Sequence, residues 1–204
     1  MRATLDTGVD ALTHAVEAYV SRKANPFSEG LALNAVPDHR TPPPPRLRRR
    51  GRGSEAREAM MLAAAQAGIA FSKAGVAFRH GMSRPIGAHF HVAHGLSNAM
   101  LFPAVTAFSV PAAESRYADC ARALGVAGDG DCDVLPAGKF VEALRDLCED
   151  LEVPTPRVNG IAKDEWFRLS PLVAEQALAS GSPADNPVGP PVDEIQDLCA
   201  QIYG

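Results

Sequence analysis

Apolar residues recur at helical spacing along most of the chain. Between Asp10 and Ser21, the residues Leu12, Val16, Tyr19 and Val20 fall on one face of a helix. Similar spacing, or strong helix formers bounded by stop signals, predicts helices at Glu55–Gly75, Leu96–Val110, Ala112–Gly125, Lys139–Pro154, Asp164–Gly181 and Val192–Gly204. No run shows the sustained alternation of a β-strand. The sequence therefore predicts an all-α fold with one domain over residues 1–204.

Local signals also predict helix ends and burial. The stretch Glu55–Gly75 is rich in Ala and Met, begins with an acidic residue and stops at a glycine. Gly125 is a stop signal of the same kind. The stretch Leu96–Val110 is apolar almost all round, which indicates a buried helix despite Pro103.

Composition narrows the class of protein. The chain has 204 residues, of which 46% are hydrophobic and 22% charged, as in a globular protein with a real core. The net charge of −4 gives no reason to expect nucleic acid or a membrane surface as a partner, and no apolar run reaches membrane-spanning length. The four cysteines are scattered, without a CxxC pair, and the sequence has no secretory segment. This favours a reducing cytoplasm and argues against a disulfide framework or a Cys-based zinc site.

One segment, Pro37–Ser54, does not fit the helical pattern. Its 18 residues contain six Arg, five Pro and one acidic residue, and the rest of the chain carries 14 basic and 23 acidic residues. We expect it to be exposed and disordered. It is interpreted first as a stretch read in a shifted frame of a GC-rich gene, next as a polyproline-like linker, and last as an SH3-type or nucleic-acid-binding motif.

Four of the six histidines lie in HGMSRPIGAHFHVAHG, from His80 to Gly95. In one continuous helix, His80 and His94 would stand about 21 Å apart, since each residue adds about 1.5 Å. Ligands of one metal lie much closer together, because each is about 2 Å from the ion. These two histidines can share a site only if the chain turns back between them, and Pro85 and Gly87 weaken the helix there.

Asp10 and His14 are four residues apart on a predicted helix, so their side chains project from one face. A carboxylate and an imidazole at this spacing can form half of a divalent-cation site, although such pairs also occur as surface hydrogen bonds. His80 alone could equally be a buried histidine with satisfied hydrogen bonds. His89 and His91 have the character of turn or cavity-lining residues.

Three blocks of the sequence together resemble the helical C-terminal domain of the iron-containing (group III) alcohol dehydrogenases. They are TGVDALTHAVEAYVSRKANPFS, HGMSRPIGAHFHVAHGLSNAMLFPAV and AEQALASGSPADNP. The resemblance runs from about Thr4 to Gly204, interrupted only by the Pro/Arg-rich segment. It implies that the metal ligands are Asp10, His14, His80 and His94, with His89 and His91 as neighbours.

The resemblance also implies the chemistry. One carboxylate and three imidazoles suit Fe²⁺, or alternatively Zn²⁺. The ion would act as a Lewis acid on the oxygen of a small-molecule alcohol or aldehyde, and hydride would pass between the substrate and NAD or NADP. We therefore expect a metal-dependent alcohol dehydrogenase, forming a homo-oligomer if the protein is intact.

The cofactor half of such an enzyme is missing from this sequence. Members of the family begin with an α/β dinucleotide-binding domain that carries a glycine-rich GGGS-type phosphate loop. The only similar stretch here, GVAGDGD (Gly125–Asp131), lacks a preceding strand. We expect a chain truncated at its N-terminus, with unknown cofactor-binding residues and little or no activity by itself.

Arg84 is a second departure, because many members of the family carry a histidine before the proline of this block. A permanently charged guanidinium suits a carboxylate or phosphate better than a proton relay. Arg84 is therefore a candidate contact for substrate or cofactor. The alternative is an ion-pairing arginine on the helix surface.

Two other functions are compatible with these residues. A degenerate remnant would fold without catalysing a reaction, and a helical metal hydrolase would use the Asp/His-bound ion to activate water. The intact GM-RPIGA and SGSPADNP blocks favour the dehydrogenase over the hydrolase. Only an assay separates the dehydrogenase from the remnant.

Overall fold

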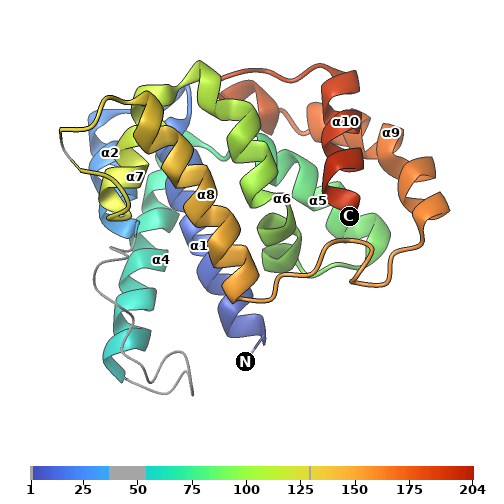
Figure 1. Ribbon diagram of the computed structural model, residues 1–204, viewed down its shortest axis with the longest axis horizontal. Helices are drawn as coiled ribbons and strands as arrows, with labels where there is room; N and C mark the ends of the chain where they lie inside the picture. The colour runs from blue at the N-terminus through green and yellow to red at the C-terminus, as the bar shows by residue number, and fades with distance from the viewer. Residues whose placement is uncertain (1, 37–53, 129) are drawn as a thin grey trace.

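The computed structural model describes residues 2–36, 54–128 and 130–204 (Figure 1). These residues form α-helices, two short 3-10 helices and no strand, which confirms the predicted all-α fold. In chain order the elements are α1 (Arg2–Val20), α2 (Pro26–Ala35), α4 (Ser54–Ala74), α5 (Phe78–Phe90), α6 (His94–Ser109), η1 (Val110–Ala112), α7 (Glu114–Ala123), α8 (Val134–Asp150), α9 (Lys163–Ala179), η2 (Ser182–Asp185) and α10 (Val192–Tyr203).

Several predicted helices and their ends are confirmed. Gly75 and Gly125 follow α4 and α7 with left-handed φ angles of 76° and 79°, which glycine adopts without steric cost. Helix α6 continues through Pro103 and buries Leu101 and Phe102 completely. Burial along α6 thus agrees with its apolar sequence.

Helix α5 corrects the prediction about Pro85 and Gly87. The helix continues through both residues to Phe90, and the chain turns only afterwards, at residues 91–93. The buried face of α5 contains Phe78, Met82 and Ile86 at four-residue spacing. Burying three large apolar side chains offsets the cost of about 3 kcal/mol for a proline inside a helix.

Helix α2 was not predicted, although its start carries clear signals. The side-chain oxygen of Asn25 accepts from the backbone N–H of Ser28 at 3.2 Å, and the Ser28 hydroxyl contacts the backbone N–H of Asn25 at 3.0 Å. This reciprocal cap, with Pro26 in the first turn, fixes the start of a helix of only ten residues. A short helix gives too few repeats for an apolar periodicity to be recognised.

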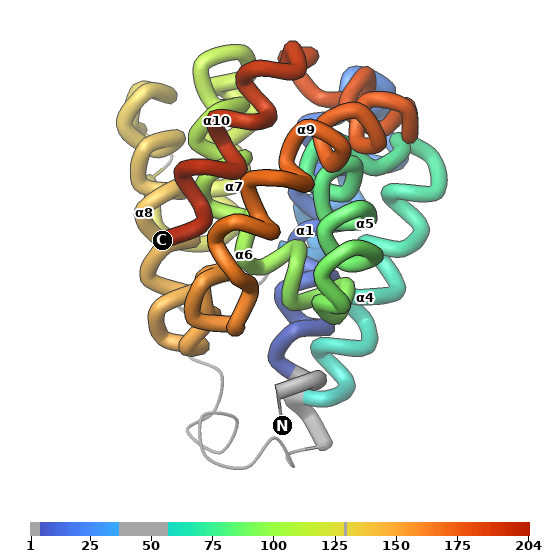
Figure 2. The backbone as a smooth tube through the Cα atoms, turned by 90° about the vertical axis from the view of Figure 1, so that its right-hand side faces the viewer, coloured from blue at the N-terminus to red at the C-terminus, as the bar shows by residue number. Residues whose placement is uncertain are grey.

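The core has two parts that meet at α6. The first cluster joins α1, α2 and α4 with α7 and α8, and the second joins α5 with α9 and α10. Helix α6 contributes Ala99 and Phe102 to the first cluster, and Leu101 and Val105 to the second. Figure 1 shows α9 and α10 on one side of α6, while α1 and α8 lie on the other. Figure 2 faces the first of these sides, so α9 and α10 lie in front. The residues that meet at this junction are those of the candidate site.

The prediction of disorder over Pro37–Ser54 lies outside the described residues, except that Ser54 is the first residue of α4. Within the described part of the chain, no single helix is long and apolar enough to cross a membrane. One pair of helical segments, Arg57–Ala74 and Phe78–Phe90, is long and apolar enough when taken together, but the two segments are bent by 106°. All four cysteines are free thiols.

Candidate metal centre

Helix α1 supplies the first two donors of the candidate site. Asp10 and His14 lie on successive turns, and His14 Nε2 is 3.6 Å from Asp10 Oδ2. Both side chains are about one-fifth exposed. The helical spacing recognised in the sequence therefore brings this carboxylate and this imidazole to one face of α1.

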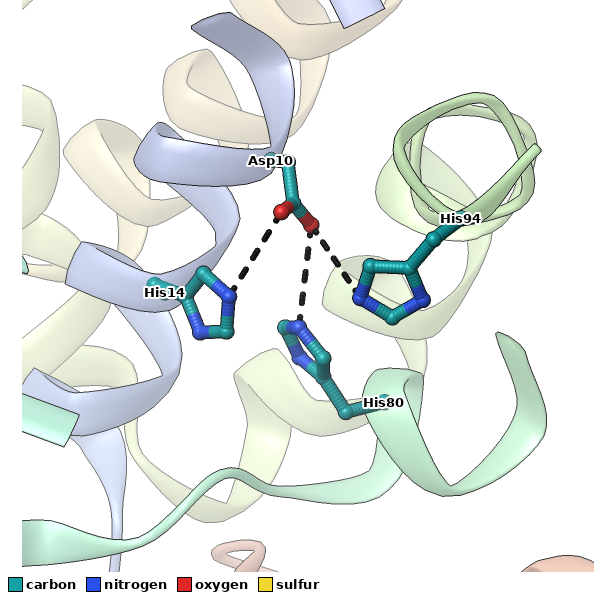
Figure 3. A group of neighbouring side chains, drawn as sticks. All are labelled: Asp10, His14, His80 and His94. Atoms are coloured by element: carbon teal, nitrogen blue, oxygen red, sulfur yellow. Dashed lines mark ion pairs between the residues drawn. The ribbon is translucent and has the colours of Figure 1, made fainter. Parts of the chain in front are cut away.

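Helices α5 and α6 supply the other two donors. His80 Nε2 and His94 Nε2 lie 3.7 and 3.6 Å from Asp10 Oδ1, so both imidazoles converge on the carboxylate (Figure 3). His80 is buried, whereas the side chain of His94 is 48% exposed. The chain turns between the two histidines through His91, whose φ of 54° is left-handed. His80 and His94 thus meet in space, as sharing a site requires.

The spacing of the four donors suits one metal ion. One ligand atom from each of Asp10, His14, His80 and His94 can be chosen so that all lie within 4.8 Å of one another. Separations of 3.6–3.7 Å between nitrogen and oxygen are too long for direct hydrogen bonds. They are close to the spacing of about 3.3–3.6 Å expected for tetrahedral ligands that lie about 2.0–2.2 Å from an ion. The residues present therefore fit a divalent cation.

A glycine allows α6 to begin close to α1. A Cβ added at Gly95 would lie 2.6 Å from the carbonyl oxygen of Asp6 and 2.8 Å from its carbon. Any larger residue would push the two helices apart at this point. Because Gly95 follows His94 directly, this close approach positions His94 beside Asp10.

Asn98, one turn after His94, contacts the donor set directly. Its buried Nδ2 donates to Asp10 Oδ1 at 2.6 Å and lies 3.1 and 3.3 Å from Nε2 of His94 and His80. The lone pairs of Asp10, His80 and His94 therefore point to one small volume. Asn98 Oδ1 and His14 Nδ1 are buried and have no hydrogen-bond partner among the residues that the structure describes. Asn98 was not predicted from the sequence, although its position four residues after His94 placed it on the same helix face.

Glu17 is a second residue that the sequence analysis missed. Its buried carboxylate lies behind His80, with Oε2 2.5 Å from His80 Nδ1. Arg79 is also buried, and its Nε lies 4.0 Å from Glu17 Oε1. Glu17 lies seven residues after Asp10 and three after His14, so it is on the same face of α1 as these two ligands. This spacing was the sequence signal that could have identified it.

The electrostatics of the site favour positive charge between the two carboxylates. Burial acts to raise the pKa of Asp10, but the neighbouring His14 and His80 outweigh it and hold that pKa well below its usual range. Burial acts to lower the pKa of His80, but Glu17 and Asp10 raise it overall. Burial, helped by the other cationic groups nearby, lowers the pKa of His94. Asp10 is therefore ionised, and a cation beside it is stabilised.

His89 and His91 lie apart from these four donors. His89 Nε2 is 2.8 Å from Gln176 Oε1 on α9. Both histidines line a separate surface pocket of ≈ 210 Å³, together with Asn159, Gly160 and Glu165. Their placement agrees with the expectation that they are turn or cavity-lining residues.

Arg84 lies one turn beyond His80 and is exposed to solvent. Its Nη1 donates to the hydroxyl of Ser182 at 3.2 Å. Its positive charge is among the influences that lower the pKa of His94. Arg84 thus lies near the exposed side of the donor set, with its guanidinium hydrogen-bonded to η2.

Comparison with known proteins gives consistent matches. Residues 4–203 match the family described as "Fe-containing alcohol dehydrogenase family, C-terminal". The chain is 32% identical over 207 residues to an NADPH-dependent butanol dehydrogenase of Clostridium saccharobutylicum, covering 99% of this chain and 51% of that protein. It is 33% identical over 208 residues to a 1,3-propanediol dehydrogenase of Citrobacter freundii, with coverage of 98% and 51%.

Solved structures give the same result. The crystal structure of a 1,3-propanediol oxidoreductase matches with a TM-score of 0.87 and 33% identity, over 98% of this chain and 51% of that one. An alcohol dehydrogenase from Oenococcus oeni matches with a TM-score of 0.87 and 30% identity. The chain spans about half the length of the relatives it matches.

Proposed function

The chain belongs to the Fe-containing alcohol dehydrogenase family, and we propose that residues 1–204 are its metal-binding catalytic domain. In this proposal Asp10, His14, His80 and His94 together hold one divalent cation, Fe²⁺ or alternatively Zn²⁺. The observation that carries the proposal is the separation of 3.6–3.7 Å between Asp10 and each histidine, which suits ligands around one ion.

The chemistry of the donors supports the same assignment. Three imidazoles and one carboxylate suit Fe²⁺ and Zn²⁺. When bound, such an ion supplies Lewis-acid polarisation of an alcohol or aldehyde oxygen. The side chain of His94 is 48% exposed and leaves one side of the donor set accessible from solvent, whereas His80 is buried. A small-molecule substrate would therefore approach from the side of His94.

The proposed reaction is hydride transfer between that alcohol or aldehyde and NAD or NADP. The names of the relatives support the substrate class, since they include a butanol dehydrogenase and 1,3-propanediol dehydrogenases. Arg84 is proposed to contact an anionic group of the substrate or cofactor, because its guanidinium is exposed near His94. We also propose that the protein is cytoplasmic and, if intact, a homo-oligomer, without a nucleic-acid or membrane partner.

Metal content tests the proposed ligands. The purified chain, loaded with Zn²⁺ or anaerobically with Fe²⁺, should retain up to one ion per chain after desalting. His80→Ala and His94→Ala should each lose most of this metal, because each removes one of four ligands. His89→Ala and His91→Ala are matched controls from the same stretch and should retain it. Unchanged metal in both His80→Ala and His94→Ala would refute the assignment.

Turnover tests the reaction. Hydride transfer requires both reactants to be held at about 3–3.5 Å in the right orientation. The 204 residues contain no glycine-rich phosphate loop of the expected kind, so we expect little or no oxidation of short primary alcohols with NAD⁺ or NADP⁺ by this chain alone. Supplying a dinucleotide-binding half, fused or as a separate chain, should produce activity. Robust turnover by the 204-residue chain alone would contradict the proposal that a separate half binds the cofactor. Inactivity after a dinucleotide-binding half is supplied would favour a non-catalytic remnant.

A further inference from the structure

Glu17 makes an unusually complete set of contacts for a buried carboxylate. Its Oε1 accepts from the backbone N–H of Arg79 at 2.8 Å, and its Oε2 accepts from that of Ala77 at 3.0 Å. The same Oε2 lies 2.5 Å from Nδ1 of His80. Three donors from one short segment, residues 77–80, therefore converge on a carboxylate from a different helix.

These contacts determine which nitrogen of His80 carries the proton. The carboxylate can only accept, so Nδ1 of His80 must be the donor. In the neutral imidazole, Nε2 is then unprotonated and offers its lone pair. Nε2 is also the atom that faces Asp10 Oδ1 at 3.7 Å. Glu17 thus leaves His80 in the tautomer that a metal requires, aimed at the candidate site.

Arg79 places a buried positive charge beside this carboxylate. Its guanidinium is buried over the ring of Phe102, with Cζ 3.6 Å from the ring centroid, and its Nη2 donates to the carbonyl of Thr13 at 3.3 Å. Its Nε lies 4.0 Å from Glu17 Oε1. A cation beside the carboxylate and two backbone N–H groups that donate to it favour the charged form of Glu17.

The same contacts determine where α5 begins. Ala77 precedes the first residue of α5 and has no side chain that could cap the helix. Glu17, on α1, caps the helix instead by accepting hydrogen bonds from two of the N–H groups at its start. Its negative charge is also favourable at a helix N-terminus. The start of α5 and the ring orientation of His80 are consequently held by one side chain.

We propose that Glu17 is a positioning residue of the metal site, which fixes His80 in its Nδ1–H tautomer and joins α1 to the start of α5. The inference rests on the proposed metal site and deepens it. Glu17 would bind no metal itself. It would act through His80, by orienting the ring and raising the basicity of Nε2.

The first test compares Glu17→Gln with Glu29→Gln. Glu29 also pairs with an arginine, Arg116 at 2.7 Å, so the control makes the same chemical change at another carboxylate. An amide has one oxygen where Glu17 has two. With that oxygen toward His80, the Arg79 N–H loses its acceptor, and with the amide nitrogen there, the Ala77 N–H and His80 Nδ1 lose theirs. In Zn²⁺ titrations against a competing chelator, Glu17→Gln should weaken binding about 10–100-fold, and Glu29→Gln less than about threefold. A folded Glu17→Gln that binds Zn²⁺ as tightly as the control would overturn the proposal.

The second test observes the imidazole and needs no variant. In the zinc-loaded wild-type chain with ¹⁵N-labelled histidine, long-range ¹H–¹⁵N NMR should show His80 protonated at Nδ1 and metal-bound at Nε2. The reverse assignment would overturn the proposal even if Glu17→Gln fails to fold. If Glu17→Gln folds, its metal-free His80 should no longer be fixed as the Nδ1–H tautomer, because an amide nitrogen that faces Nδ1 selects the Nε2–H form, a change that simple loss of packing would not produce. Failure of the wild-type chain to bind zinc would refute the metal site itself, whereas normal wild-type binding with an unaffected Glu17→Gln would refute only this inference.

Discussion

Asp10 and His14 lie on successive turns of one helix, whereas His80 and His94 lie on two helices joined by a three-residue turn. The first half-site needs only that α1 is helical. The second depends on contacts between elements, namely the close approach at Gly95 and the hold of Glu17 on the start of α5. Local spacing therefore builds one half, and tertiary packing builds the other.

Because of this difference, mutations are expected to affect the two half-sites differently. A change to a supporting residue such as Gly95 should alter the position of a histidine in the second half-site while leaving Asp10 and His14 on their helix. A change to Asp10 should affect both halves, because its two oxygens face all three histidines (Figure 3).

Asp10→Ala should have the largest effect. It removes the anionic donor that faces both half-sites, so Zn²⁺ affinity should fall more than about 100-fold, beyond the loss expected for a residue that only supports a ligand. A chelator-competition titration measures this. Asp119→Ala, which removes a carboxylate paired with Arg122 on α7, should bind Zn²⁺ like the wild type. Equal affinities for the two variants would mean that the halves are not joined through Asp10.

Gly95→Ala should have an intermediate effect that is confined to the second half-site. Its Cβ would meet the backbone of Asp6 at 2.6 Å, so α6 must shift and the chain should lose about 1–3 kcal/mol of stability. Zn²⁺ affinity should fall roughly tenfold, since His94 moves with the helix. Thermal unfolding and Zn²⁺ titration measure the two effects.

Gly138→Ala in α8 is the matched control for Gly95→Ala. A Cβ at this position would have no neighbour within 4 Å, so the chain should gain about 0.5–1 kcal/mol from the better helix propensity of alanine. Its Zn²⁺ affinity should not change. If Gly95→Ala also stabilised the chain and kept its affinity, the close approach of α6 to α1 would not be what positions His94.

Arg84→Gln should have the smallest effect, and in the opposite direction. The positive charge of Arg84 acts on His94 and so opposes a cation at the site. Its removal should strengthen Zn²⁺ binding by about two- to fivefold at low salt, and less at high salt because the arginine is exposed. Titrations at two ionic strengths measure this. Weaker binding in the variant would indicate that Arg84 supports the site rather than opposing it.

The sequence allowed the fold class to be predicted, and the i, i+4 spacing put Asp10 and His14 on one face of a helix, since both are local properties. All four ligands were assigned only through the resemblance to a family. For His80 and His94, the spacing required a turn that was expected at the wrong place. Pro85 and Gly87 did not end α5, since the burial of Phe78, Met82 and Ile86 outweighs the local cost.

The supporting residues were the hardest to predict. Glu17 and Asn98 had a visible signal, as polar residues continuing the donor faces of α1 and α6. Gly95 had none, because the need for a missing Cβ arises only when α6 meets the backbone of α1. Such close approaches depend on the packing of distant segments, which one sequence does not reveal.

We propose that both half-sites together hold one cation. X-ray absorption at the zinc K-edge of the wild-type chain, loaded with one equivalent of Zn²⁺, measures the ligands of that ion. We predict a first shell of nitrogen and oxygen at about 2.0–2.2 Å, with the outer-shell scattering of three imidazoles. A sulfur shell near about 2.3 Å would instead place the metal on a cysteine, and a single imidazole would mean that the α1 pair binds without α5 and α6. Either result would contradict the account.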